Sequence, residues 1–352
     1  MSLISIIIPI YNCERHLVAM LNSLQDQTYR RFEALMIDDG STDSSSEICK
    51  RFSKEDSRFK YYYKKNGGAA SARNYGINIA SGDYLMFLDG DDLFEKTYLE
   101  KMSSIMTNPE IDVCQCGADV FSDNGRSTSL FAAHCRRPAG VYSVSTITDD
   151  FYQRVTTVPW DKLFRRSLII DNGLQFQDLK YSNDNYFVLM SLSCANKIAY
   201  LDDIMVHYRV SEGSSLRDSM YKNPLCDLLM IDKLREDFYL RNSNINEVSL
   251  DTFCLDTVFK SMIFLSAQSE SALTSFIQEY KSNYFEKWIS QNPSFPLVRS
   301  MKERVKGWLI QHSSVSGLSW AILPYKDGKI RSMGAKDNLF LLTRMIIATT
   351  VK

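Results

Sequence analysis

Apolar and polar residues follow two different periods in the first third of the chain. The β-branched run Leu3–Ile8 stops at Pro9, which is typical of a strand buried on both faces. From Glu14 to Gln27 leucines recur on one helical stripe, so this segment is expected to be a helix. The same succession continues along the chain, with strands at Phe32–Ile37, Phe59–Tyr63 and Tyr84–Leu88 and helices at 44–52 and Ala69–Ala80. This order predicts an α/β fold with a Rossmann-like, mostly parallel sheet flanked by helices.

The second half of the chain changes character near Ser215. Before that point we expect a strand at Ile111–Cys116, a helix at Tyr181–Cys194 and a strand at Lys197–Val206. After it the periodicity is helical throughout, over 223–241, 250–266 and 272–290. We therefore predict a domain of residues 1–214 and a mainly helical C-terminal domain of residues 215–352.

The composition is that of an ordinary globular protein, with 45% hydrophobic and 24% charged residues. The net charge of −1 is unevenly distributed along the chain. From Leu297 to the end there are ten Lys or Arg residues and three Asp or Glu residues, so this tail is basic. Such a tail favours an acidic partner, which could be anionic lipid or another subunit, and we expect no nucleic acid. It is equally consistent with an ordinary solvated helical face. The apolar, basic segment 339–352 would suit an interfacial helix near a membrane, or equally a buried or oligomer contact.

The eight cysteines form no C-x-x-C pair and mostly lie in apolar stretches, as expected of thiols in a reducing compartment. Residues 1–10 lack the basic n-region of a secretory leader. No run reaches the ~18 apolar residues of a membrane span. These features predict a cytoplasmic protein, with peripheral attachment to the inner face of the membrane as an open alternative.

The segment Asp89-Gly90-Asp91-Asp92 carries the strongest chemical signal. Two carboxylates separated by one residue after an apolar strand can supply hard oxygen ligands to Mg²⁺ or Mn²⁺, together with the phosphates of a substrate. The alternative is a turn in which Asp92 caps the following helix. Its place at the end of a predicted strand favours the metal site.

Other polar groups follow neighbouring strands and should meet the acidic cluster at the carboxyl edge of the sheet. Tyr11-Asn12 follows the first strand, and Asp38-Asp39 follows the second. The segment Asn66–Asn74 opens a helix with small residues and carries Arg73, which could meet a base, a phosphate or an acidic side chain. Each of these, taken alone, is equally consistent with an ordinary turn or helix start.

Together these segments resemble the inverting family 2 glycosyltransferases, in order and spacing, throughout the first ~95 residues. The matching strings are Ser5–Asn12, Asp38–Asp43, Asn66–Gly76 and Gly82–Asp92. The resemblance implies a GT-A fold and a nucleoside-diphosphate sugar donor, most often UDP-linked. It implies donor contacts from Pro9, Tyr11, Asn12, Asp39, Asn66, Arg73, Asp89 and Gly90, with Pro9 and Tyr11 at the uracil and Asp39 and Arg73 at the base.

The resemblance also assigns the remaining roles. Asp91 and Asp89 would ligate the metal, and His207, at the end of a predicted strand, matches the place where many such enzymes supply a further ligand. Trp160 and Asp161 lie in a segment like the acceptor side of bacterial members that build surface glycans. Asp184 would be the general base, although Asn183 replaces the glutamate that precedes it in the family.

The sequence thus predicts a metal-dependent inverting transfer of a hexose or N-acetylhexosamine from a UDP-sugar to a hydroxyl of a glycan acceptor. That acceptor could be a surface polysaccharide, a glycoprotein O-glycan or a lipid-linked glycan. Inversion is a single in-line displacement, so one carboxylate suffices as base. Two alternatives stay open: a binding module that has lost catalysis, and a nucleotidyltransferase on a related sheet. The second would need a glycine- and basic-rich triphosphate loop, of which Asn66–Asn74 offers only Arg73. The oligomeric state is also open.

Overall fold

The structure, a computed structural model, describes residues 2–122, 125–127, 138–146, 152, 155–210, 224–241, 247–266 and 269–291. By its internal contacts the chain divides into two compact units. The described residues of the first unit are 2–146, 155–210 and 237–241, within the gaps given above. Those of the second are residue 152, 224–236 and 247–291. The predicted tail segment 339–352 lies outside the described residues.

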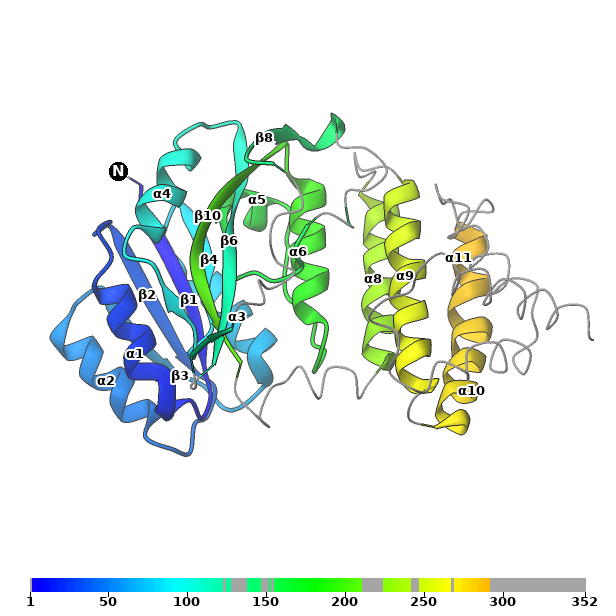
Figure 1. The fold of residues 1–352 in the computed structure, drawn as a ribbon, viewed down its shortest axis with the longest axis horizontal. Coiled ribbons are helices and arrows are strands. Elements are labelled where there is room, and N and C mark those ends of the chain that lie inside the picture. The colour runs from blue at the N-terminus through cyan, green and yellow to red at the C-terminus, as the bar shows by residue number, and fades with distance from the viewer. Residues whose placement is uncertain are drawn as a thin grey trace, which may run out of the picture. The chain divides into compact units, whose positions relative to one another are not determined.

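The first unit alternates strands and helices for most of its length (Figure 1). Its strands are β1 Ile4–Ile10, β2 Phe32–Asp38, β3 Phe59–Tyr63, β4 Tyr84–Phe87, β5 Leu93–Phe94, β6 Ile111–Ser122, β7 Gly125–Ser127, β8 Gly140–Ser143, β9 Lys162–Arg165 and β10 Lys197–Arg209. Its helices are α1 Glu14–Gln25, α2 Ser45–Glu55, α3 Gly68–Ile79, α4 Tyr98–Met106, α5 Arg166–Asp171 and α6 Asn183–Cys194, with a 3₁₀ turn at Val144–Thr146.

These elements form one mixed sheet in the order β3-β2-β1-β4-β9-β6-β10-β5, with β7 beside β6 and β8 beside β10. Strands β3, β2, β1 and β4 are parallel to one another, and β10 is parallel to β6. Between these two groups lies β9, which runs antiparallel to both β4 and β6. The mostly parallel α/β sheet predicted from the sequence is confirmed, whereas the inserted strand β9 was not predicted.

Each face of the sheet is covered by its own helices. The core on one face packs alternate strand residues against the apolar stripes of α1, α2 and α4. The other face carries α3, α5 and α6. Helix α3 approaches β1 closely because Gly76 has no side chain: a Cβ there would lie 2.4 Å from Cγ2 of Ile7. Close packing of α3 fixes the position of the polar residues that it carries.

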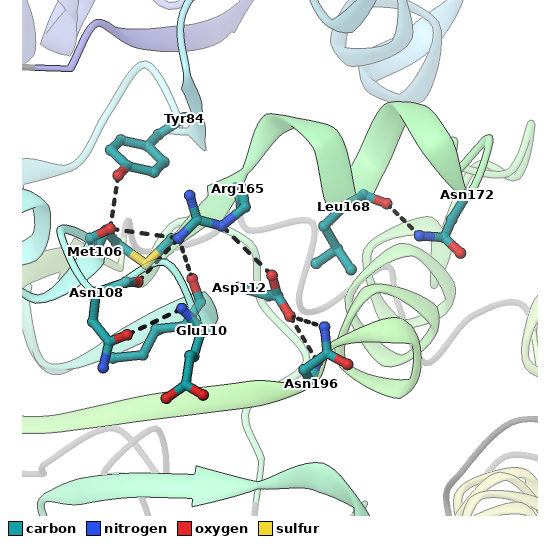
Figure 2. Close-up of polar contacts among 10 residues, drawn as sticks. Tyr84, Met106, Asn108, Glu110, Asp112, Arg165, Leu168, Asn172 and Asn196 are labelled. Carbon is teal, nitrogen blue, oxygen red and sulfur yellow. Dashed lines mark hydrogen bonds and ion pairs between the residues drawn. The ribbon is translucent and has the colours of Figure 1, made fainter.

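At the amino edge of the parallel strands, Arg165 at the end of β9 joins several chain segments (Figure 2). Its Nη2 donates to the carbonyl oxygens of Asn108 at 3.1 Å and of Ile111 at 2.7 Å. Its Nε lies 3.5 Å from Oδ1 of Asp112, whose other oxygen accepts from the backbone and side chain of Asn196 at 2.7 and 3.0 Å. The Arg165 network therefore ties the starts of β6 and β10 to β9.

The second unit is helical (Figure 1), with α8 Pro224–Leu240, α9 Glu247–Ser266, α10 Glu270–Glu279 and α11 Glu286–Gln291; the last residues of α8 group with the first unit. The sequence predicts one helix over 272–290, but a π-helical segment, Tyr280–Phe285, separates α10 from α11. The extra residue in a π turn shifts the helical phase, and both Tyr280 and Trp288 are fully buried here. Within the described part of the chain no helix combines the length and hydropathy needed to span a membrane.

Candidate functional site

The carboxyl ends of β1, β2 and β4 lie at one edge of the sheet, as their register requires. Ile10 pairs with Asp38, Ile7 pairs with Phe87, and the amide of Asp39 donates to the carbonyl of Ile10 at 2.8 Å. The polar clusters that follow these strands are therefore neighbours. Ligands of open α/β sheets bind at this edge.

One aromatic and one amide side chain, those of Tyr11 and Asn12, directly follow β1. Tyr11 is 54% exposed, so its ring is available to stack on a planar ligand. Asn12 has a positive φ of 48°, and its Oδ1 accepts from the amide of Thr42 at 2.8 Å. This bond fixes the loop after β1 against the loop after β2. Pro9, within β1, pairs with Ile37.

Asp39 holds the loop that precedes α3. Its carboxylate, 3% exposed, accepts from the amides of Gly67 at 3.0 Å and Gly68 at 2.7 Å, and Lys64 Nζ lies 2.5 Å away. A carboxylate at a helix N-terminus also interacts favourably with the helix dipole. These contacts place the exposed Asn66 beside the edge. A contact from Asp39 to a base, which the resemblance implies, stays a prediction.

The loop after β4 gathers three carboxylates with different exposure. Asp89 and Asp91 are partly exposed, whereas Asp92 is fully buried. Burial, followed by the nearby charge of Asp89, raises the pKa of Asp91 to about 6. Arg209 supports the loop from β10: its amide donates to Asp92 Oδ1 at 2.9 Å and its Nε to the carbonyl of Asp91 at 2.8 Å. Gly90 lets the loop pack on Cys13, because a Cβ there would lie 3.0 Å from the sulfur.

Arg73 connects this acidic loop to the start of α6. Its Nη2 donates to Oδ1 of Asp89 at 2.7 Å, and its Nη1 donates to Oδ1 of Asp184 at 2.6 Å. The side chain is 5% exposed, whereas those of Asp89 and Asp184 are 30% and 35% exposed. One buried cation thus bridges two carboxylates that stay accessible to a ligand.

Asp184 lies in the first turn of α6, which begins after Ser182 in the left-handed region at φ 62°. Burial raises the pKa of Asp184, and the positive charge of Arg73 opposes that shift. The preceding Asn183 is 8% exposed, and its Nδ2 donates to the carbonyl of Leu179 at 3.0 Å. Asn183 therefore serves the local backbone, while Asp184 faces the candidate site.

His207 has protein partners at both ring nitrogens. Nδ1 lies 2.6 Å from Asp119 Oδ1, and Nε2 lies 2.9 Å from Glu95 Oε1. A ligand role would require one of these contacts to open. Among the described residues no three His, Cys, Asp or Glu side chains form a cluster able to hold a metal. A metal-ligand role for His207 thus stays a prediction.

Trp160 and Asp161 are in the interior, because they lead into the central strand β9. Trp160 is 3% exposed and stacks on Tyr208 with ring centroids 5.4 Å apart. Asp161 is fully buried, and one of its oxygens lies 2.7 Å from Nζ of the equally buried Lys162. An acceptor role for this pair stays a prediction, and the described geometry gives both side chains internal partners instead.

The sequence did not predict the contacts of Lys64 and Arg209 with the aspartates, and for Arg73 it left an acidic partner as one possibility without naming it. Lys64 and Arg209 lie 25 and about 118 residues from their partners in the chain, and no local spacing marks such pairs. Arg73 was predicted to approach the base of the donor. The signal that could have found the bridge is that Arg73 is the single Lys or Arg within the matching strings, which also contain several aspartates.

Residues 5–173 match the family model described as glycosyl transferase family 2. The chain is 32% identical over 223 residues to the glycosyltransferase GlyA of Streptococcus pneumoniae, covering 61% of this chain and 31% of that protein. It is 28% identical over 226 residues to the glycosyltransferase GlyG of the same organism, covering 61% of this chain and 73% of that protein. The chain therefore spans about a third of GlyA and about three quarters of GlyG.

A structural comparison agrees in fold. The crystal structure of S. aureus TarS 1-349 in complex with UDP-GlcNAc has a TM-score of 0.59 and 20% sequence identity, covering 98% of this chain and 91% of that chain. Together with the sheet described above, this likeness gives the GT-A fold. Over residues 5–173 the chain is thus similar to glycosyl transferase family 2.

Proposed function

We propose that the chain transfers a hexose or N-acetylhexosamine from a UDP-sugar to a hydroxyl of a glycan acceptor, with inversion and with a divalent cation. The observation that carries this proposal is the bridge of Asp89 and Asp184 by Arg73. It brings a carboxylate of the acidic loop and the candidate base within reach of one guanidinium. The donor class is supported by the UDP-GlcNAc complex of the structural neighbour.

The residues present fit a bound Mn²⁺ or Mg²⁺. Asp89 and Asp91 are both partly exposed at the carboxyl edge and lie two residues apart in one loop, so their carboxylate oxygens are available to a cation. Mg²⁺ is usually held by one or two protein carboxylates together with substrate phosphates, so two aspartates suffice. Such a cation would offset the negative charge that builds on the leaving diphosphate.

The protein side chains account for the remaining chemistry. The acceptor oxygen forms a bond to the anomeric carbon as the bond from that carbon to the diphosphate oxygen breaks, and UDP leaves. The proton of the acceptor hydroxyl passes to the Asp184 carboxylate. No second acid is needed, because a cation-bound diphosphate leaves without protonation, unlike the alcohol released by a glycosidase.

The nucleoside part of the donor would lie along the loops after β1, β2 and β3. Tyr11 offers an exposed aromatic face, and Pro9 is adjacent in the chain. Asn12, Asp39 and Asn66 surround the same edge, and Gly90 permits close approach of the acidic loop to α1. The acceptor is a surface polysaccharide, a glycoprotein O-glycan or a lipid-linked glycan, and contact with membrane or a second copy would come from the basic tail.

A panel of UDP-sugars tests this function. The wild-type chain is incubated with UDP-GlcNAc, UDP-GalNAc, UDP-glucose and UDP-galactose, Mn²⁺ and glycan acceptors, and released UDP and extended glycan are measured. We expect one or two donors to be consumed, and Asp91→Asn or omission of Mn²⁺ to lower the rate about 10²-fold or more.

Two outcomes would contradict the proposal. UDP binding without consumption of any donor, with every acceptor, would indicate a binding module without catalysis. Release of pyrophosphate from a nucleoside triphosphate and a sugar phosphate would indicate nucleotidyl transfer.

A further inference from the structure

Two adjacent residues of α3 make contacts that span more than a hundred residues of the chain. Asn74 exchanges two hydrogen bonds of 2.8 Å with the backbone of Phe176, and Arg73 meets Asp184. Phe176 lies in the segment that leads into α6, and Asp184 lies in the first turn of α6. Asn74 therefore holds the backbone before α6, and Arg73 holds a carboxylate in its first turn.

The surroundings of Arg73 fix its direction. The guanidinium carbon lies 5.2 Å from the ring centroid of Phe176, which stacks on Phe187 of α6 at 3.9 Å. The Arg73 side chain is 5% exposed, and its Nη1 and Nη2 each donate to a carboxylate. The guanidinium group is therefore directed toward protein groups. A planar guanidinium holds two carboxylates in a fixed relative direction, which an ammonium cannot do.

The contacts leave Asp184 able to react. Arg73 takes Oδ1, and no described residue makes a hydrogen bond with Oδ2. The side chain is 35% exposed. One oxygen is thus fixed, and the other can accept the proton of an incoming hydroxyl.

We infer that Arg73 is the positioning residue of the candidate base, which it aligns and couples to Asp89, instead of contacting the nucleobase as the family resemblance implies. The inference rests on the proposed function, because it needs Asp184 to act as base and Asp89 to lie beside the donor cation.

The neutral residue at position 183 agrees with this role. Asn183 Oδ1 lies 3.5 Å from Arg73 Nη1, a longer contact than the one to Asp184. A carboxylate at position 183 would be a third anion beside one guanidinium. Because the Asn183 amide is neutral, the positive charge of Arg73 is balanced by Asp89 and Asp184 alone among these three neighbours.

The test is a double-mutant cycle of Arg73→Lys and Asp184→Asn in the full chain, with Arg165→Lys as the matched control at the opposite edge of the sheet. For each variant, kcat for UDP release is measured at saturating donor and Mn²⁺, and Kd for UDP is measured by calorimetry. Melting curves report folding, and added guanidinium ion with Arg73→Ala gives a rescue readout that loss of fold does not produce.

We expect Arg73→Lys to lower kcat about 10²-fold, the lower end of the usual contribution of a positioned base. Kd for UDP should change less than about 3-fold, and the double variant should match the slower single variant within about 3-fold, because residues that act as one unit are not additive. Guanidinium ion should restore part of the activity of Arg73→Ala, and Arg165→Lys should keep kcat.

An unchanged kcat with a Kd for UDP raised about 10-fold would assign Arg73 to the nucleobase and overturn the inference, as would losses that multiply in the double variant. Either result leaves the proposed function standing, because the wild type still turns over. Failure of the wild type with every donor would instead overturn the proposed function, and the inference with it.

Discussion

Two arginines bridge elements at opposite edges of the same sheet, and they differ in what surrounds them. Arg165, at the amino edge, donates to backbone carbonyls and pairs with Asp112, whose other oxygen is taken by Asn196 (Figure 2). Arg73, at the carboxyl edge, pairs with two carboxylates that are each about a third exposed. The first network is closed by protein groups, whereas the second leaves carboxylate oxygens for a ligand.

The difference shows that the role of an arginine-bound carboxylate can be inferred from whether its second oxygen also has a protein partner. An acid whose oxygens are all taken by protein groups has a structural role, because nothing remains to bind substrate. An acid held by one oxygen and exposed at the other is oriented and still able to react. The chemical function is therefore expected only at the edge where the aspartates are incompletely satisfied.

Arg165→Ala should have the largest effect on stability and little effect on chemistry. The substitution removes hydrogen bonds to the carbonyls of Asn108 and Ile111 and the ion pair with Asp112. A buried acceptor left without its donor costs about 1–3 kcal/mol. Urea or thermal unfolding measures the loss. The kcat for UDP release per folded molecule should equal that of the wild type, and a loss of kcat without loss of stability would place Arg165 in the catalytic machinery.

Glu33, also at the amino edge, should give a smaller effect that depends on pH. Burial raises the pKa of this carboxyl, but hydrogen bonds from Lys60, Ser5 and Ser81 outweigh burial and lower the pKa to about 2. Because the folded-state pKa is below the value of 4.5 for an unperturbed glutamate, the stabilisation is present above about pH 4.5 and is lost as the pH falls toward 2.

The measurement is the free energy of unfolding of wild type and Glu33→Gln between pH 7 and pH 2.5. The difference between the two should shrink as the pH falls through this window. A constant difference would show that the hydrogen bonds of Glu33 do not depend on its charge.

The sequence predicted the parallel half of the sheet well, because its strands are β-branched runs separated by amphipathic helices. The strand at Phe59–Tyr63 has the predicted bounds, and the others differ by a few residues. Strand β9 was missed, since its four residues carry no period of their own and pair antiparallel with distant strands. The same omission is why the burial of Trp160, next to β9, was not predicted.

The candidate site was predictable as a set of loops and less so as a set of contacts. Strand order alone places Tyr11, Asp39 and Asp89 at one edge. The bridge from Arg73 to Asp184 depends on the start of α6 lying within reach of an α3 side chain 111 residues earlier, and on the positive φ of Ser182. Neither has a local signature in the sequence, so only tertiary packing could reveal the bridge.

The most direct test compares the carboxylate partners of the two arginines. UDP release from the donor identified in the panel is measured, with Mn²⁺ and acceptor, for wild type, Asp184→Asn and Asp112→Asn at equal folded concentration. We expect Asp184→Asn to lower kcat about 10²- to 10⁴-fold, the usual contribution of a general base, while Asp112→Asn retains wild-type kcat at reduced stability. Equal activity of the Asp184→Asn variant and the wild type would contradict the assignment of the chemistry to the carboxyl edge.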